Sequence, residues 1–393
     1  MATLLPPLRL TGAHVLRDGA LQARSLAFAD GEITKGPLPE VDLSGYLVLP
    51  GIVDLHGDAF ERHLAPRKTA RFETTAAIRA ADAEAAANGI TTSWMAQSWS
   101  WEGGLRGPDF AESFLAAHSA YRPQALTDLR VQIRCETHLL ETGPRLLETV
   151  ERHGVDYVIF NNHLPEAVEL AKTSPERLAE WAAQAGRTPE AHMEFLEAML
   201  ERAREVPRHL CRLAEGFDRM RVRYGSHDDA DGETREFYSM IGARIAEFPT
   251  SRRAAAAASA INDPVLMGAP NVVQGGSRAG NVSAERLIRE GLCDALVSDY
   301  YYPALPAAAF ALADREVIPL AEAWSMISTR PAAILGLVDR GHLSAGRRAD
   351  FVVIHAESRR IEATVSGGRL AYMAGEAGAR FLSTLSSLRL AAE

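Results

Sequence analysis

Short apolar runs alternate with alanine-rich, helix-forming stretches along most of the chain. The strand-like runs are 51–56, 89–96, 130–136, 155–161, 221–226, 244–249, 264–269 and 294–299. Strands that alternate with helices are typical of a parallel sheet, and eight such units in roughly 250 residues suit a (β/α)8 barrel. The pattern therefore predicts an α/β fold, a TIM-like (β/α)8 barrel, over residues 51–340.

The two ends of the chain have a different pattern. Residues 1–50 read as short strands broken by turns, with Asp30-Gly31 as a hairpin signal. Residues 341–393 again contain short strand-like runs, RRADFVVIHAE and TVSGGRLAYMAG. We expect the two ends to pair and form one small composite β domain.

Residues 165–220 are longer than an ordinary crossover between two barrel strands. Ser174-Pro175 and Thr188-Pro189 each read as a helix N-cap followed by proline at the first helical position. The segment is therefore interpreted as a helical excursion beside the barrel mouth. It serves as a lid, as an oligomer contact or simply as packing against the barrel.

Composition excludes several classes of protein. Of 393 residues, 47% are hydrophobic and 24% charged, which is typical of a soluble globular protein. The net charge of -9 argues against general binding to nucleic acid or to anionic membranes. The cysteines are scattered without a CxxC pair, and no run has the length and apolarity of a membrane span. We expect a cytoplasmic protein.

Polar side chains stand at the ends of five strand-like runs. In a barrel of this type those ends meet on one face, where the active site lies. A lone histidine or aspartate there is often a core residue or a helix cap, but several in one order favour a metal site. The candidate ligands are His56, Asp58, Glu136, His163, His227 and Asp299.

The chemistry of these side chains indicates the ion. Histidine and carboxylate without cysteine suit one or two divalent ions, with zinc first and manganese or iron as alternatives. Two ions need a bridging anion, and Glu136 is a better candidate than a carboxylated lysine because no lysine ends a strand-like run. The ions would lower the pKa of a shared water toward roughly 7. Asp299 would then accept its proton as general base.

Two features bear on the substrate. Residues 268–281 follow the seventh run and combine paired glycines with donors that could face phosphates, as loops after strands seven and eight often do. The candidates there are Asn271, Gly275, Gly276, Ser277, Arg278 and Asn281. Arg62 and Arg67 follow the first metal pair and would bind a polyanion, although a solvated surface is the alternative. Together they predict a small polyanionic substrate.

These motifs resemble a known family. LPGIVDLHGD and LSAGRRADFVVI resemble the amidohydrolase superfamily. YGSHDDA, AEFPT, LMGAPNVVQGGSRAGN and VSDYYYP, in this order, resemble the PhnM family, the amidohydrolases of the bacterial carbon–phosphorus lyase pathway. The resemblance spans about residues 45–372. It implies a diphosphatase of phosphonate metabolism that releases pyrophosphate from alpha-D-ribose 1-methylphosphonate 5-triphosphate, with the six residues above as ligands and residues 275–281 facing the phosphates.

The chain departs from the common patterns at several positions. His56-x-Asp58 replaces the His-x-His of the wider superfamily, a change that the PhnM family shares, and Gln274, Arg278 and Ala59 also differ from the family. Another hydrolysis, of a C–N bond in a cyclic amide or an amino-sugar, is therefore the alternative function. A homo-oligomer or an association with other phosphonate-pathway proteins would be compatible with either.

Overall fold

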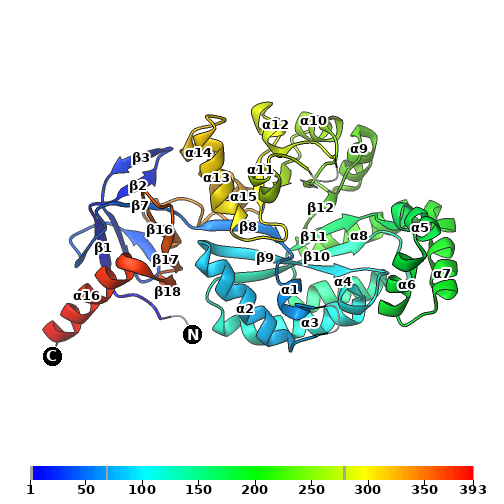
Figure 1. Ribbon diagram of the computed structural model, residues 1–393, viewed down its shortest axis with the longest axis horizontal. Coiled ribbons are helices and arrows are strands. Elements are labelled where there is room, and N and C mark those ends of the chain that lie inside the picture. Colours follow the sequence, from blue (N-terminus) through cyan, green and yellow to red (C-terminus); the bar gives the residue numbers. More distant parts are fainter. Residues whose placement is uncertain (1–2, 68–69, 278–279, 393) are drawn as a thin grey trace.

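A closed parallel barrel forms the centre of the molecule (Figure 1). The computed structural model describes residues 3–67, 70–277 and 280–392. Each barrel strand pairs in parallel with the next. The strands are β8 (Ile52–Gly57), β9 (Ile90–Trp99), β10 (Asp128–Glu136), β11 (Tyr157–Asn161), β12 (Arg223–His227), β13 (Ala246–Glu247), β14 (Val265–Gly268) and β15 (Ala295–Val297). A parallel bridge between Gly57 and Asp299 joins the last strand to the first.

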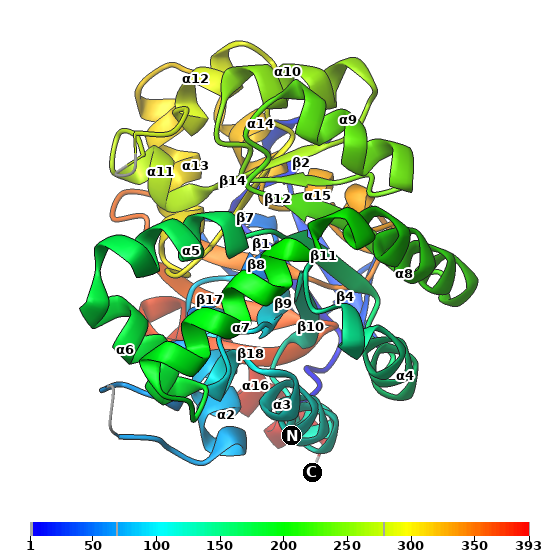
Figure 2. The ribbon, with the colours of Figure 1, turned by 90° about the vertical axis from the view of Figure 1, so that its right-hand side faces the viewer.

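The eight predicted runs coincide with these eight strands, so the predicted barrel is confirmed. Helices surround the barrel (Figures 1 and 2). They are α1 (Glu61–Leu64), α2 (Thr74–Ala87), α3 (Pro108–Tyr121), α4 (Gly143–His153), α8 (Val206–Met220), α9 (Gly232–Ile241), α10 (Arg252–Ala260), α11 (Ala269–Val273), α12 (Ala284–Arg289), α13 (Ala304–Asp314), α14 (Leu320–Ser325) and α15 (Thr329–Ile334). Short 3₁₀ turns are η1 (Gly104–Arg106), η2 (Arg122–Gln124), η3 (Leu140–Thr142) and η4 (Ala203–Glu205).

Side-chain caps fix where several crossover helices begin. Asp231, Ser251 and Ser283 precede α9, α10 and α12, and each accepts a hydrogen bond from a backbone N–H of the first turn. Such bonds satisfy donors that the helix itself leaves unpaired. None of the helices in the described part of the chain is long and apolar enough to span a bilayer.

Both ends of the chain build the composite β domain that the sequence predicts. One sheet has the order β18-β17-β16-β7-β2-β3, and in it β16 from the C-terminal part pairs antiparallel with β7 from the N-terminal part. The other has the order β5-β4-β1-β6, and β4 and β5 form the hairpin predicted at Asp30-Gly31. The elements are β1 (Leu8–Thr11), β2 (His14–Arg17), β3 (Ala20–Ala23), β4 (Leu26–Ala29), β5 (Glu32–Thr34), β6 (Glu40–Asp42), β7 (Tyr46–Pro50), β16 (Phe351–His355), β17 (Ile361–Ser366), β18 (Arg369–Met373) and α16 (Gly375–Ala392).

The predicted excursion is helical and lies at one end of the barrel (Figure 2). It contains α5 (Leu164–Thr173), α6 (Pro175–Gln184) and α7 (Pro189–Glu201) before the chain returns through α8. Both predicted prolines open a helix, and the Thr188 hydroxyl accepts a hydrogen bond from the Ala191 N–H at 3.2 Å. Trp101, Leu164 and Leu196 belong to a small apolar core of its own.

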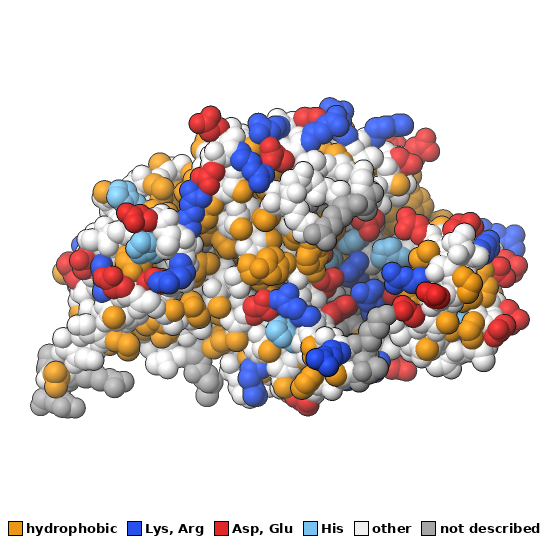
Figure 3. Space-filling view, in the orientation of Figure 1, with side chains coloured by type: hydrophobic (Ala, Val, Ile, Leu, Met, Phe, Trp, Pro, Cys, Tyr) orange, Lys and Arg blue, Asp and Glu red, His pale blue; other side chains and the backbone are white. Residues whose placement is uncertain are grey.

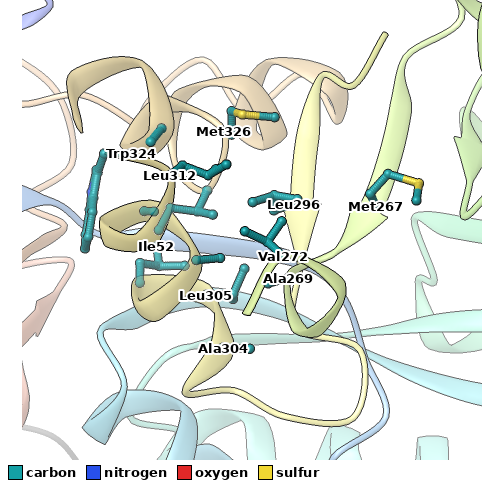
Figure 4. Close-up of a cluster of buried hydrophobic side chains, with 14 of the residues drawn as sticks. Ile52, Met267, Ala269, Val272, Leu296, Ala304, Leu305, Leu312, Trp324 and Met326 are labelled. Atoms are coloured by element: carbon teal, nitrogen blue, oxygen red, sulfur yellow. The ribbon is translucent and has the colours of Figure 1, made fainter. Parts of the chain in front are cut away.

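A large apolar cluster attaches the last crossover helices to the barrel (Figure 4). Leu305 and Leu312 on α13 pack with Leu296 on β15, and all three are fully buried. Burial of one such leucine contributes about 1.5–3 kcal/mol. The Trp324 indole adds a hydrogen bond from Nε1 to the Pro50 carbonyl at 2.9 Å. This packing holds β15, whose C-terminal end carries Asp299, against β8.

A buried carboxylate joins the first barrel strand to the last. The Ser298 backbone N–H donates to Asp54 Oδ1 at 2.9 Å, and the Ser298 hydroxyl donates to Oδ2 at 2.6 Å. Both residues are fully buried. Burial raises the pKa of Asp54 to about 7 in spite of these hydrogen bonds. The pair closes the barrel directly below the residues that end β8 and β15.

Asp54→Ala is expected to lower the free energy of unfolding by about 2–4 kcal/mol, because it leaves the buried Ser298 donors without an acceptor. Urea denaturation followed by circular dichroism measures the change. Asp109→Ala is the control, since the Asp109 side chain is 92% exposed, and it should change the value by less than about 0.5 kcal/mol. Equal effects of the two substitutions would show that the Asp54–Ser298 pair does not hold the barrel closed.

Candidate metal centre

The ends of β8 and β15 bring three predicted ligands together. His56 is on β8, Asp58 directly follows β8, and Asp299 lies two residues after the end of β15. The Asp299 N–H donates to the His56 carbonyl at 3.0 Å, and the Asp58 N–H donates to the Asp299 carbonyl at 2.8 Å. One ligand atom from each of the three side chains lies within 4.8 Å of the others. Barrel closure therefore also assembles the first candidate ion site.

A second group of ligand atoms adjoins the first. His163 follows β11, His227 ends β12, and Asp228 comes next, with its N–H bonded to the Glu247 carbonyl at 2.9 Å. Ligand atoms of the three side chains lie within 4.8 Å of one another. The His227 ring is 5.5 Å from that of His56, centroid to centroid. His227 thus links the two groups. The predicted order of the strands is also confirmed, because the fourth and fifth barrel strands, β11 and β12, precede His163 and end in His227.

A buried glutamate lies behind one histidine of each group. Glu247 on β13 accepts from His56 Nδ1 at 2.8 Å and also from Gln132 Nε2 and the Tyr157 hydroxyl, at 2.7 and 2.6 Å. Glu136 on β10 lies 2.8 Å from His163 Nδ1. A carboxylate on one ring nitrogen fixes the ring and leaves the other nitrogen for a metal ion. These contacts make Glu136 a positioning residue. Glu247 supports His56 and also forms a third possible ligand group with His56 and His227.

Glu136 therefore differs from the other five predicted ligands, because it contacts a histidine ligand and is not grouped with the ligand atoms. Its Oε2 accepts from the Trp101 indole at 3.3 Å and from the His163 backbone N–H at 3.2 Å. Among the described residues it belongs to none of the ligand groups. The arrangement favours Glu136 as a support for His163, and the bridging role predicted for it stays a prediction.

The sequence analysis missed three residues of the centre. Glu247 lies inside the sixth predicted strand, and Asp228 directly follows His227. Arg134 lies two positions before Glu136, on the same face of β10, with Nη1 3.6 Å from Asp58 Oδ2 and Nη2 3.5 Å from His227 Nε2. Arg134 could have been predicted from its position, because residues two apart on a strand point to the same face.

The donor set fits a divalent cation. Burial lowers the pKa of His227, which favours the neutral imidazole that binds metals. His227 Nδ1 lies 2.9 Å from Asp228 Oδ2 without the alignment of a hydrogen bond. Within the described ranges no cysteine belongs to the ligand groups. Imidazole and carboxylate donors suit zinc, manganese or iron.

The pKa of Asp299 is unusual for an aspartate. Burial, and after it the neighbouring Asp58 carboxylate, raise this pKa to about 6. The group is then ionised at pH 7 but accepts a proton more readily than an exposed aspartate does. That balance suits a general base.

A cavity of about 390 Å³, here called the loop cavity, opens above both groups. Arg134, His227 and Asp299 line it together with described residues of the loop that follows β14. Predicted substrate residues that line it are Asn271, Gly276, Ser277 and Asn281. Asn271 Oδ1 also accepts from the Ala284 N–H at 3.0 Å, so it holds the loop to α12.

The other predicted residues of this loop do not all line the cavity. Gly275 and Gly276 have φ values of +79° and +148°, a backbone conformation that favours glycine. Gly275 is not among the described residues that line the loop cavity. Arg278 lies outside the described residues, so its predicted role is not addressed by the structure.

A second cavity of about 880 Å³, here called the lateral groove, meets the loop cavity at Asp58 and Tyr300. Figure 3 shows a hollow there, where histidine, arginine and acidic side chains gather between the barrel and the α5–α7 excursion. Arg62 lines the groove and donates to the Tyr300 carbonyl at 3.0 Å. Arg67 is exposed and is not among the described residues lining either cavity.

Comparison with known sequences gives two matches. The profile described as "Amidohydrolase family" matches residues 278–372. A curated relative from Escherichia coli (strain K12), alpha-D-ribose 1-methylphosphonate 5-triphosphate diphosphatase, is 33% identical over 371 residues. The match covers 90% of this chain and 96% of the relative.

Comparison with solved structures shows the same fold at low identity. N-acyl-D-glutamate deacylase from Bordetella bronchiseptica, complexed with zinc and a phosphonate inhibitor, has a TM-score of 0.57 at 16% identity, covering 94% of this chain and 97% of its own. N-acetylglucosamine-6-phosphate deacetylase from Pasteurella multocida has a TM-score of 0.59 at 11% identity, covering 93% and 99%.

His227→Ala is expected to lower the content of bound zinc, because His227 belongs to the group with His163 and Asp228 and also to the group with His56 and Glu247. Glu247→Gln should weaken zinc binding by about 10–100-fold, as loss of a carboxylate behind a metal-binding histidine typically does. Mass spectrometry of the dialysed protein and isothermal titration measure the two effects. The exposed His14→Ala is the control. Wild-type zinc content in His227→Ala would contradict the assigned centre.

Proposed function

The chain belongs to the PhnM family of the amidohydrolase superfamily, and on that premise we propose that it is a metal-dependent diphosphatase. Its proposed substrate is alpha-D-ribose 1-methylphosphonate 5-triphosphate, and its proposed reaction releases pyrophosphate in phosphonate catabolism. The observation that carries the proposal is the loop cavity. In it, two adjoining ligand groups and Arg134 face a glycine-containing loop.

The ions that these residues would hold are divalent. His56, Asp58 and Asp299 would hold one, and His163, His227 and Asp228 the other. When bound, such ions supply a nucleophilic water at neutral pH and stabilise charge on a phosphoryl oxygen. We propose zinc as the native metal, because nitrogen and oxygen donors without sulfur are typical of catalytic zinc sites.

Side chains of the protein would accept the proton of the attacking water and offset the negative charge on the phosphoryl group. Water oxygen forms a bond to the phosphorus nearest the ribose, and the bond from this phosphorus to the oxygen of the leaving pyrophosphate breaks. Asp299 accepts the proton of the attacking water as general base. The Arg134 guanidinium, already 3.6 Å from Asp58, offsets negative charge on the transferred group.

The loop at 268–281 would bind the leaving pyrophosphate. The Gly275 and Gly276 N–H groups already donate to the Val272 and Asn271 carbonyls and so shape the turn. The side chains of Ser277 and Asn281, which line the cavity beside Gly276, would contact the pyrophosphate. A hydrogen bond from Gln274 Nε2 to the Tyr300 hydroxyl, at 2.8 Å, holds the loop beside Asp299. This contact supports the proposal that pyrophosphate departs toward the loop.

Phosphorus NMR of zinc-loaded protein with this substrate is expected to show pyrophosphate release by the wild type. Asp299→Asn should reduce the rate by about 10²–10⁴-fold, because the variant lacks the proton acceptor. Metal content is measured in parallel to separate loss of the base from loss of an ion. The exposed Asp109→Asn is the control.

Absence of pyrophosphate release by the metal-replete wild type would refute the diphosphatase proposal. The same protein would then be tested for hydrolysis of C–N bonds, with cyclic amides and N-acyl amino-sugars as substrates.

A further inference from the structure

The lateral groove extends from the metal centre in the direction away from the glycine loop. Asp58 lies on both cavities, and Tyr300 separates them. The Tyr300 hydroxyl faces the loop through Gln274, while its carbonyl accepts from Arg62 on the groove side. A substrate that reacts beside Asp58 therefore has room for one end in each cavity.

The outer wall of the groove comes from the excursion. Arg177, Trp181 and Gln184 on α6 line it. Trp181 packs edge-on against Trp101 with ring centroids 5.8 Å apart. One turn further along, at the C-terminal end of α6, a Cβ on Gly103 would lie 2.8 Å from the Ala185 Cα, so only glycine allows this close approach. Helix α6 is thus held in a fixed position across from the loop after β8.

Four arginines line the groove, and two of them are already neutralised. Arg106 lies 3.1 Å from both Glu61 and Glu102. Arg62 pairs with Glu84 as well as with the Tyr300 carbonyl. These contacts make Arg62 and Arg106 part of the wall.

The guanidinium groups of the other two arginines are not hydrogen-bonded to a carboxylate within the described residues. Arg71, in the segment before α2, makes no ion pair or hydrogen bond within the described part of the chain. Arg177 forms an ion pair with Glu180, which also lines the groove, but at 3.8 Å this carboxylate accepts no hydrogen bond from the guanidinium. The two arginines reach the groove from different segments, Arg71 from the chain before α2 and Arg177 from α6.

We propose that Arg71 and Arg177 bind the second anionic group of the substrate, the phosphonate at ribose C1. The triphosphate then lies in the loop cavity, and the uncharged ribose passes Tyr300 and Trp181, whose rings offer apolar surface. This assignment rests on the proposed function. It gives the excursion a role in substrate recognition and makes the enzyme selective for a substrate that is anionic at both ends.

Two substrates separate this role from a general effect on catalysis. One is alpha-D-ribose 1-methylphosphonate 5-triphosphate, and the other is a methyl riboside 5-triphosphate, which lacks the second anion. Pyrophosphate release gives kcat/KM for each. For the wild type, the ratio of the two values is expected to favour the first substrate by about 100-fold, because each of the two arginines would contribute about 10-fold, the range of a charge-assisted hydrogen bond.

Arg71→Ala and Arg177→Ala should each lower that ratio by about 10-fold, and the double variant should remove most of it. The change is expected in KM more than in kcat, because a remote contact binds ground state and transition state alike. Arg71→Lys should recover part of the ratio. Arg219→Ala, exposed on α8 outside both cavities, is the matched control, and thermal unfolding checks that each variant is folded.

The outcomes distinguish the two proposals. Release of pyrophosphate from both substrates with equal kcat/KM, or variants that slow both substrates equally or not at all, would overturn the subsite alone. Failure of the wild type to release pyrophosphate from either substrate would overturn the proposed function and this assignment with it.

Discussion

The contact between the first and last barrel strands is the constraint on which both the fold and the site depend. Below the site, Asp54 accepts two hydrogen bonds from Ser298. Toward the C-terminal ends of the two strands, backbone hydrogen bonds between His56, Asp58 and Asp299 also join β8 to β15. Three candidate ligands therefore take their positions from the closure of the barrel, and a barrel open at this edge would have no first ion site.

Buried carboxylates also orient two of the candidate metal-binding histidines. Glu247 and Glu136 are almost completely buried, and a buried carboxylate is costly unless it is paired and hydrogen-bonded. Each has its partners: His56, Gln132 and Tyr157 for Glu247, and His163 with Trp101 for Glu136. Burial of these carboxylates thus orients the ligands before any ion binds, which is the preorganisation that metal catalysis needs.

Much of the fold could be predicted from the sequence, because barrel strands are buried on both faces and read as continuous apolar runs. Even β13, with only Ala246–Glu247 in the strand, lies inside a predicted run. The pairing of β7 with β16 was also expected. The fine arrangement of the excursion was not, because the contact of α6 with Gly103 joins segments far apart in the chain.

The site was predicted less completely. Residues directly at strand ends, such as His56 and His227, could be found from position alone. Glu247 and Arg134 could not be ranked, because a charged residue inside a strand gains its role only from the partners that closure brings to it. The role of Glu136 shows the same limit, since a strand-end carboxylate can hold an ion or hold the histidine that does so.

In the proposed reaction, water attacks the phosphorus nearest the ribose, beside Asp58 and Asp299. Hydrolysis in water enriched in oxygen-18, followed by phosphorus NMR of the products, locates the new oxygen through its isotope shift. Attack at this phosphorus puts one label in the ribose 5-phosphate product and none in pyrophosphate. Label in pyrophosphate, or release of a single labelled phosphate, would contradict it.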